Sequence, residues 1–303
     1  MVDQIVAIAS VVIPAFNHER YVEEAVQSVL DQTYPGVELI VVDDASHDRT
    51  SEIVQRLADR HGFTFIRNER NLGLNATLER GLARSSGDYV SILASDDAIL
   101  PHKIARQVEY LQSTGKDGVY ANGLYLRDDG SRAPIDLAGV ARRFRDRTIL
   151  RYIYTQDTHA PLLQSALIRR DALLALWPVR SQFRSDDWVT LIKLIEGYEV
   201  GFIDEPLFLY RQHEANTHRD YRATFPMRLQ VIEGAVPPRY RAEAMANLLS
   251  SQASYLRKDG NFGEALGLAL NSARMNPSPM RLLRHVARRL GAACRKARRL
   301  IQG

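Results

Sequence analysis

Short apolar segments alternate with amphipathic segments along the first half of the chain. The apolar segments are rich in β-branched residues, whereas the amphipathic segments repeat apolar residues every three or four positions. The predicted strands are Ser10–Ile13, Val37–Val42, Phe63–Ile66 and Tyr89–Leu93, and the predicted helices are Tyr21–Gln32, Thr50–His61 and Leu74–Ala83. This alternation favours βαβ units and a parallel sheet with both faces covered. We expect Pro14 to end the first strand.

The pattern is less regular in the second half of the chain. The elements predicted there are strands at Gly118–Arg127, Ser165–Arg169 and Val200–Ile203, and a helix at Trp188–Glu196. From about Phe225 onward the pattern is helical. We therefore predict an α/β domain over residues 1–222, with halves of about 1–115 and 116–222, followed by a helical region over 223–303.

Composition narrows the class of protein. The chain has 303 residues, of which 45% are hydrophobic and 25% charged, which is typical of a folded globular protein. No run of about 18 apolar residues predicts a transmembrane helix, and Met1–Gln4 lacks the basic start of a signal peptide. The single cysteine, Cys294, excludes a disulfide scaffold. We expect a cytoplasmic protein.

Positive charge is concentrated at the C-terminal end. Residues 281–303 contain eight Lys or Arg and no acid, so removing them from the net charge of +4 leaves −4 for residues 1–280. The same segment carries one apolar helical stripe, formed by Leu283, Val286, Leu290, Ala293, Ala297 and Leu300. This basic tail would either pack on the body of the protein or lie on an anionic membrane. Nucleic-acid binding is not expected, because no aromatic residues interleave the charges.

Acidic pairs follow two of the predicted strands. Asp43 and Asp44 follow the second strand, and Asp96 and Asp97 follow the fourth. The carboxyl ends of parallel strands form the ligand-binding edge of such sheets. Four carboxylates there repel one another unless a cation or hydrogen-bond donors lie between them. A divalent cation that also binds a phosphate would satisfy this need, although each pair alone is also typical of a helix N-cap.

Glycine-rich phosphate loops are absent from the sequence. Neither G-x-x-x-x-G-K-[ST] nor a G-x-G-x-x-G after a strand occurs. A nucleotide bound here would therefore be held by carboxylates and a metal ion.

A series of short motifs, in this order and spacing, resembles family 2 glycosyltransferases. The motifs are Val11–Asn17, Val26–Tyr34, Glu38–Thr50, Asn71–Asn75, Ser86–Val90 and Ser95–Asp97. The resemblance is dense over residues 9–115 and thinner over 160–215. It implies the GT-A fold, which is an α/β fold with a Rossmann-like, mostly parallel sheet and flanking helices, here with a C-terminal α-helical extension. It also implies a nucleotide-diphospho-sugar donor, Mn²⁺ or Mg²⁺, and inversion at the anomeric carbon.

The resemblance also implies roles for the residues at the strand ends. Phe16 would stack on the base in a pocket lined by Pro14, and Asp44, supported by Asp43, would accept a hydrogen bond from uracil or thymine. Asp97 would coordinate the metal ion, and Asp96 would face the ribose or the metal. The other donor-binding positions that it implies are Asn17, Asn71, Gly73, Ser95 and Arg211.

Two motifs in the second half resemble the acceptor side of the family. Ser185–Trp188 is similar to the Glu-Asp-aromatic motif, which makes Asp187 the catalytic base and Asp186 a supporting residue where Glu is usual. A carboxylate there would take the proton from an acceptor hydroxyl. Tyr210–His213 is similar to a Tyr-Arg-x-His segment, in which Arg211 would help to position the diphosphate and His213 would touch the diphosphate or the metal. Without the resemblance, an N-cap pair is the better interpretation of Asp186 and Asp187.

Because of two departures from the family pattern, the sequence does not determine which sugar nucleotide is the donor. Ala94 replaces an acid that many relatives carry two residues before the aspartate pair. After Ala76 and Thr77 the sequence has Leu78 and Glu79, so a basic or amide contact to the nucleotide is missing.

The function that the resemblance implies is metal-dependent, inverting transfer of a sugar from a UDP- or dTDP-sugar. The acceptor would be a hydroxyl of a glycan or of a polyprenyl-diphosphate-linked sugar in surface-polysaccharide synthesis, at the inner face of the membrane. One alternative is a catalytically inactive, sugar-nucleotide-binding partner subunit. Another is a receiver-like signalling domain, because Val41–Asp44 is an acid pair that ends a strand, although a strand and a helix precede it.

Overall fold

The computed structural model describes residues 6–155, 161–180, 182–183, 187–213 and 221–275. Asp186 and the basic tail, residues 281–303, lie outside these ranges. The chain folds as two compact units. The α/β unit comprises residues 1–153 and 159–216, and the helical unit comprises residues 154–158 and 217–303.

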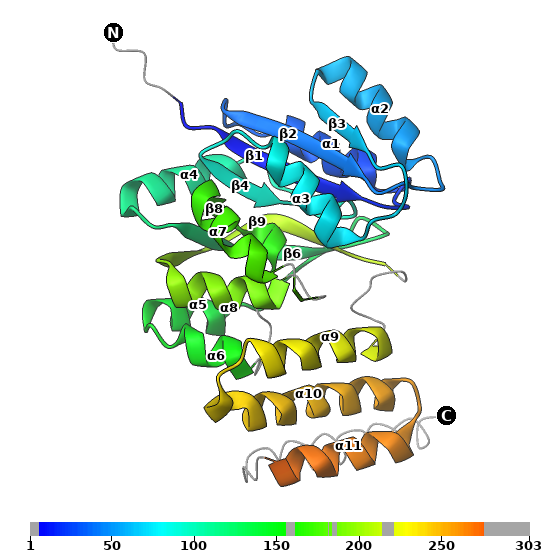
Figure 1. The fold of residues 1–303 in the computed structure, drawn as a ribbon, viewed down its shortest axis with the longest axis vertical. Coiled ribbons are helices and arrows are strands. Elements are labelled where there is room, and N and C mark those ends of the chain that lie inside the picture. The colour runs from blue at the N-terminus through cyan, green and yellow to red at the C-terminus, as the bar shows by residue number, and fades with distance from the viewer. Residues whose placement is uncertain (1–5, 156–160, 181, 184–186, 214–220, 276–303) are drawn as a thin grey trace, which may run out of the picture. The chain divides into compact units, whose positions relative to one another are not determined.

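The first half of the α/β unit alternates strands and helices as the sequence pattern predicts. Its elements are β1 (Ala9–Ala15), α1 (Val22–Leu30), β2 (Val37–Asp43), α2 (Thr50–His61), β3 (Thr64–Arg67), α3 (Leu74–Arg84) and β4 (Tyr89–Ile92). The four strands are parallel and lie in the order β3-β2-β1-β4. In Figure 1, α3 lies in front of β1 and β2, and α1 lies behind them. The chain moves across the sheet in one direction from β1 to β2 to β3, and then returns past β1 to β4. Because crossovers between parallel strands are right-handed, this return places α3 on the face opposite to α1.

The prediction that Pro14 ends the first strand is wrong. Strand β1 continues through Pro14, which pairs with Val42 in the parallel ladder with β2. The ladder with β4 on the other side of β1 stops at Val12. The missing N–H of Pro14 faces that open side, so no ladder hydrogen bond is lost.

The sheet continues beyond β4 with strands of mixed direction. The remaining elements of the α/β unit are β5 (Ala98–Ile99), α4 (Lys103–Thr114), β6 (Gly118–Arg127), β7 (Arg132–Pro134), α5 (Ala138–Arg145), α6 (Ile149–Thr155, whose last two residues belong to the helical unit), a 3₁₀ turn η1 (Leu163–Ser165), β8 (Leu167–Arg169), α7 (Arg170–Arg180), α8 (Asp187–Gly197) and β9 (Val200–Gln212). The order after β4 is β8-β6-β9-β5, and β7 pairs with β6. The fold is thus the predicted α/β class with a mostly parallel sheet.

Strand β9 is much longer than the predicted Val200–Ile203. It pairs with β6 along its whole length, with register shifts around Asn122. Pro206 lies at one of these shifts, where a proline interrupts the ladder least. This extension carries the chain from the core of the sheet to Tyr210 and Arg211.

Helix α3 packs closely on the centre of the sheet. Val12, Ile13, Ile40 and Val41 on β1 and β2 are fully buried. A Cβ atom on Gly81 of α3 would lie 2.4 Å from Val12 Cγ1. Glycine is therefore required at this helix–strand contact for the backbone of α3 to approach β1.

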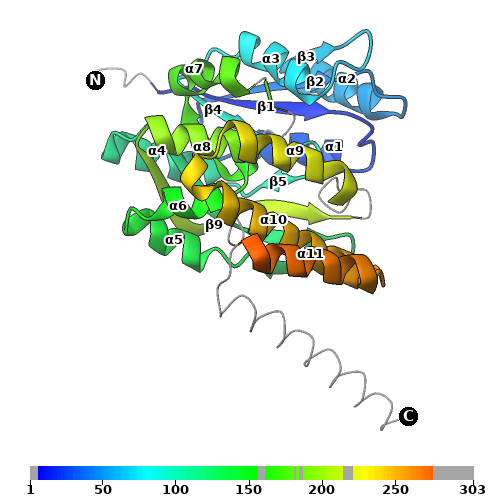
Figure 2. The same ribbon diagram turned by 60° about the horizontal axis from the view of Figure 1, so that its bottom comes forward.

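The helical unit consists of three described helices that lie side by side in Figures 1 and 2, α9 (Tyr221–Gly234), α10 (Pro238–Lys258) and α11 (Phe262–Met275). Pro238 is the first residue of α10, a position that tolerates the missing N–H. The Ser272 hydroxyl donates to the Ala246 carbonyl (2.7 Å) and joins α11 to α10. None of the described helices has the length and hydropathy needed to cross a bilayer.

Candidate active site

Two loops at the carboxyl end of the sheet are held together by Asn17. This residue adopts a left-handed conformation (φ 53°), which asparagine tolerates better than most residues. Its N–H donates to Ser46 Oγ (2.9 Å), and its side-chain oxygen accepts from the His47 N–H (2.8 Å). The structure therefore places Asn17 as a link between the β1–α1 and β2–α2 loops.

Phe16 is an exposed aromatic side chain beside this link. It is 37% exposed, and its ring lies 6.2 Å from the His47 ring in an edge-on arrangement. Pro14, two residues earlier, is half-buried. An exposed ring beyond the end of a central strand has a free face on which a planar group could stack.

Asp43 and Asp44 are buried and organise backbone turns. Asp43 accepts the Ser46 N–H (3.1 Å) and lies 3.8 Å from the Arg67 guanidinium. Asp44 accepts from the Asn68 amide (2.7 Å) and from the N–H groups of Leu72 and Gly73 (both 2.8 Å). An ionised carboxylate offers about four acceptor positions, so Asp44 keeps capacity for one more donor.

The Asn71–Gly73 turn leads into α3. Gly73 has a positive φ of 83° and precedes the first residue of the helix. The Asn71 side chain accepts from the Gly73 N–H (3.1 Å). The contacts with Asp44 and Asn71 therefore fix the turn that was predicted to bind the donor.

Asp96 is joined by two histidines from distant parts of the chain. Its Oδ2 lies 3.0 Å from His213 Nε2, beyond the end of β9. His18, from the β1–α1 loop, completes a group whose candidate ligand atoms all lie within 4.8 Å of one another. Burial lowers the pKa of His18, which favours the neutral ring that a metal ion requires.

This group fits a divalent cation. Two imidazole nitrogens and a carboxylate oxygen are common ligands of such ions. Metal–ligand bonds of about 2.1 Å bring the ligand atoms of one ion within about 4.2 Å of each other. The three side chains would therefore have to move by less than about 1 Å to share an ion.

Asp97 points into the protein rather than toward this group. It is 1% exposed and accepts from the Arg211 N–H (2.8 Å) and the Gln164 amide (2.9 Å), one on each oxygen. Burial, together with the negative charge of Asp96, raises the pKa of Asp97 well above its usual range. Of the two aspartates predicted as metal ligands, the structure brings only Asp96 to His18 and the predicted ligand His213.

Arg211 connects the Asp96–Asp97 segment to α1. Its Nε donates to the Asp96 carbonyl (2.8 Å), and its guanidinium forms an ion pair with Glu24. The guanidinium also lies over the Tyr21 ring (5.0 Å), which stacks on the His213 ring (4.8 Å). The predicted diphosphate contact, Arg211, therefore sits among contacts that hold the metal-ligand candidates in place.

Asp187 is the first residue of α8 and half-buried. The positive end of the helix dipole stabilises a carboxylate there. Burial raises the pKa of Tyr210, and the charges of Asp97, Asp96 and Asp187 raise it further. Asp187 and the Asp96–Asp97 pair therefore act electrostatically on one side chain, while Asp186 lies outside the described residues.

Several residues around the site have no counterpart in the sequence predictions. They are His18, Tyr21, Glu24 and Gln164. His18 follows Asn17 just beyond a predicted strand, at the edge of the sheet where ligands bind. The sequence could therefore have indicated His18 as a site residue. Gln164 carried no such signal, because η1 reaches Asp97 only through the folding of the second half. Trp177 and Trp188 are both buried in the core.

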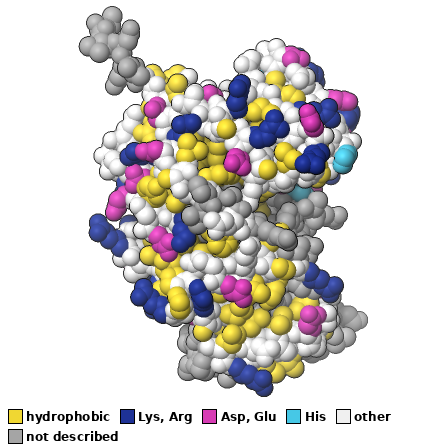
Figure 3. Space-filling model, in the orientation of Figure 1, with side chains coloured by type: hydrophobic (Ala, Val, Ile, Leu, Met, Phe, Trp, Pro, Cys, Tyr) yellow, Lys and Arg dark blue, Asp and Glu magenta, His cyan; other side chains and the backbone are white. Residues whose placement is uncertain are grey.

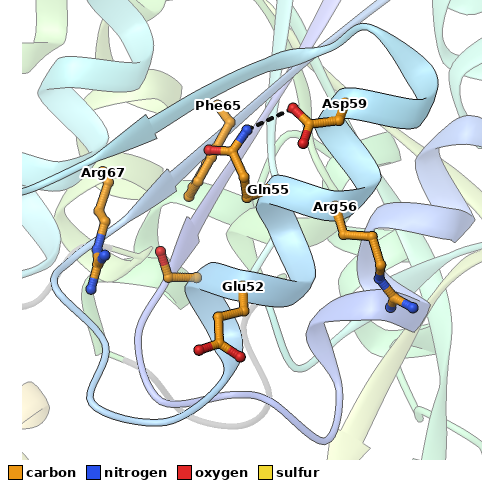
Figure 4. A pocket seen from close by; sticks show the side chains of 7 residues that line it. Glu52, Gln55, Arg56, Asp59, Phe65 and Arg67 are labelled. Carbon is orange, nitrogen blue, oxygen red and sulfur yellow. Dashed lines mark hydrogen bonds between the residues drawn. The ribbon is translucent and has the colours of Figure 1, made fainter.

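A separate hollow of about 570 Å³ lies between α2 and β3. Figure 4 shows its charged lining, with Gln55 donating to Asp59 and with Glu52, Arg56 and Arg67 around it. Arg56 is paired with Glu23, and Arg67 lies near Asp43. Asp59, Arg56 and Arg67 of this hollow thus have partners among neighbouring side chains, and the hollow does not include the residues predicted to bind the donor.

Comparison with known proteins identifies related chains. The family model described as Glycosyl transferase family 2 matches residues 10–177. The chain is 33% identical over 132 residues to the putative teichuronic acid biosynthesis glycosyltransferase TuaG of Bacillus subtilis, a match that covers 43% of this chain and 51% of TuaG. The chain thus spans about half the length of that relative.

Solved structures share the fold. S. aureus TarS residues 1–349, in complex with UDP-GlcNAc, superposes with a TM-score of 0.61 at 19% identity, covering 93% of this chain and 87% of that one. The mannosyltransferase PcManGT from Pyrobaculum calidifontis, in complex with GDP-Man and Mn²⁺, superposes with a TM-score of 0.62 at 20% identity, covering 95% and 80%. These likenesses establish the fold as GT-A.

Proposed function

The chain belongs to glycosyl transferase family 2, and we propose that it is a metal-dependent enzyme that transfers a sugar with inversion from a nucleoside-diphospho-sugar to a hydroxyl of a glycan or lipid-linked acceptor. The main observation that supports this proposal is that Asp187 and the Asp96–Asp97 pair lie close to the same side chain, Tyr210. Burial raises the pKa of Tyr210, and the charges of Asp97, Asp96 and Asp187 raise it further, so all three carboxylates lie near this side chain. A general base and a donor-side carboxylate near one side chain suit a displacement at a carbon bound beside it.

The donor in this proposal is a UDP- or dTDP-sugar. Phe16 would stack on the base, beside Pro14. Asp44 has capacity for one more hydrogen-bond donor, such as the N3–H of uracil or thymine. Asp43, Asn17, Asn71, Gly73 and Ser95 would act by holding the loops in which these contacts lie.

The cation in this proposal is Mn²⁺ or Mg²⁺, held by Asp96 and His213 with Asp97 packed behind them. A divalent cation would offset the negative charge that develops on the departing diphosphate. Arg211 would keep Asp96 and the His213 ring in place through its contacts with the Asp96 carbonyl and Tyr21. The presence of Mn²⁺ in the PcManGT structure supports a metal of this kind.

Asp187 would act as the general base. Its carboxylate would take the proton from the acceptor hydroxyl as that oxygen forms a bond to the anomeric carbon. The bond from that carbon to the diphosphate would break on the opposite face, so the anomeric configuration would invert. Asp186 would support Asp187 from the preceding position.

The acceptor in this proposal belongs to surface-polysaccharide synthesis. The similarity to TuaG, a putative teichuronic acid biosynthesis enzyme, supports this class of acceptor. The basic amphipathic pattern of residues 281–303 supports binding of the enzyme to the anionic inner surface of the cell membrane. A polyprenyl-diphosphate-linked glycan would lie at that surface.

The experiment is a donor panel with Asp187→Asn. We expect the wild-type protein with Mn²⁺ to release UDP or dTDP from one sugar nucleotide when an acceptor is present. Loss of a general base should slow transfer by about 10²–10⁴-fold while nucleotide binding is kept. Asp31→Asn, at the exposed end of α1, is the matched control. Nucleotide binding without turnover for every donor and acceptor would favour the inactive partner subunit instead.

A further inference from the structure

We propose that His18 is a third protein ligand of the cation, together with Asp96 and His213, and that its imidazole makes the site select Mn²⁺ over Mg²⁺. This inference rests on the proposed function, because it concerns the cation that would bind the donor diphosphate. It adds a ligand from the loop after β1, which the sequence motifs did not assign.

The position of His18 is fixed from two directions. Its backbone N–H donates to Thr50 Oγ1 (2.8 Å) at the start of α2. Its ring Nδ1 lies 2.8 Å from Ser95 Oγ, next to Asp96. With Nδ1 held by Ser95, Nε2 is the ring nitrogen available to a cation. Metal-binding histidines are typically oriented in this way through the nitrogen that does not bind the metal.

Three separate segments converge on one point. His18 comes from the β1–α1 loop, Asp96 from the segment after β4, and His213 from the end of β9. The rings of His18 and His213 lie 6.1 Å apart and nearly perpendicular (84°). The ring of Tyr21 lies 6.1 Å from the His18 ring and stacks on the His213 ring. The two imidazoles are thus packed in place beside the carboxylate, which suits a preformed ligand set.

The ligand types determine which cation is favoured. Mg²⁺ prefers oxygen ligands and keeps much of its water, whereas imidazole nitrogen suits transition metals. A site with two imidazoles and one carboxylate therefore favours a first-row transition ion. Among these, Mn²⁺ also accepts carboxylate, water and phosphate oxygens readily, so it suits the remaining coordination positions.

The test measures Mn²⁺ binding directly, by electron paramagnetic resonance of the full chain with Mn²⁺ alone and with Mn²⁺ plus UDP. Spin-echo modulation from ¹⁴N reports imidazole coordinated to the ion. We expect His18→Gln to weaken Mn²⁺ binding by about tenfold or more and to reduce the ¹⁴N modulation. His61→Gln, an exposed histidine at the end of α2, is the control and should change neither.

His18→Asp separates a lost ligand from a damaged fold. It replaces nitrogen with oxygen at the same position, so it should retain cation binding while lowering the ratio of Mn²⁺ to Mg²⁺ affinity. A ¹⁴N modulation that His18→Gln leaves unchanged would overturn the inference and leave the proposed function intact. An absence of Mn²⁺ binding in every variant would overturn the inference as well. Donor turnover without any divalent cation would in addition overturn the metal-dependent part of the proposed function.

Discussion

Single buried polar side chains hold the second half of the α/β unit against its first half. Lys103 of α4 is fully buried, and its side-chain nitrogen donates to Ser91 Oγ (2.8 Å) and the Ala166 carbonyl (3.2 Å). Gln107, one turn later, donates to the Ser165 carbonyl (2.7 Å). These contacts fix the turn that carries Gln164, and Gln164 donates to Asp97. The position of Asp97 therefore depends on two residues of α4 that lie outside the site.

The stability of the α/β unit should depend on pH through Lys103. Burial lowers the pKa of this lysine from 10.5 to about 7 in the folded state. Between these values the unfolded chain binds more protons than the folded one, so the free energy of unfolding rises with pH. We expect Lys103→Met to remove a slope of up to about 1.4 kcal/mol per pH unit between pH 7 and 10.

Urea titrations at several pH values, followed by the fluorescence of the buried Trp177 and Trp188, would measure this slope. Met removes the amine but leaves the hydrogen bond from Ser91 Oγ to the Ala166 carbonyl (2.8 Å). The variant should therefore fold. Equal slopes for wild type and Lys103→Met would contradict the buried, neutral amine.

At the scale of elements, a close packing contact joins α3 to β1. Helix α3 starts at the turn held by Asp44 and passes over the centre of the sheet at Gly81. Any change that lifts α3 would also disturb the Asn71–Gly73 turn. The helix therefore links the packing of the core to the geometry of the candidate donor site.

Gly81→Ala should destabilise the protein although alanine is the better helix former. The added methyl would meet Val12 Cγ1 at 2.4 Å in a fully buried region. Overpacking costs about 1–3 kcal/mol, which outweighs the gain of up to about 1 kcal/mol in helix propensity. Gly267→Ala in α11 has no heavy atom within 4 Å and should stabilise the helical unit instead. Thermal unfolding of both variants checks this, and a rise in melting temperature for Gly81→Ala would refute it.

The sequence predicts elements best where pairing is local and burial is continuous. Strands β1, β2 and β4 follow from their apolar runs, because most of their residues are buried on both faces of the sheet. The short strand β5 and the full length of β9 depend on partners far along the chain, so no local pattern indicates them. The site shows the same limit. Asp96 and Asp97 are adjacent, and only the contacts from Gln164 and the Arg211 N–H determine which of them turns inward.

For the molecule as a whole, exposed hydrophobic side chains and positive charge are concentrated toward the C-terminal end of the chain. Hydrophobic side chains gather over the helical unit in Figure 3. On α11, Phe262, Leu266, Leu270 and Met275 are all exposed. The basic tail of residues 281–303 follows soon after this helix in the sequence. An apolar helix surface followed by a basic amphipathic segment is typical of association with an anionic membrane.

Removal of residues 281–303 should abolish co-sedimentation with vesicles that contain anionic lipid. The tail carries eight positive charges and no acid, so binding of the full chain should also fall as salt rises. Transfer to a water-soluble acceptor should be unchanged in the shortened chain. Equal sedimentation of both proteins would instead favour a tail that packs on the body.

The proposed function requires a nucleoside diphosphate and a divalent cation to bind together at Asp96. Thermal-shift titration with UDP, dTDP, GDP and CDP, each with and without Mn²⁺, tests it most directly, because a ligand that binds only the folded state raises the melting temperature. We predict a shift with UDP or dTDP that requires Mn²⁺, persists in Asp31→Asn and disappears in Asp96→Asn. A nucleotide shift of the same size without Mn²⁺, or one retained in Asp96→Asn, would contradict the account.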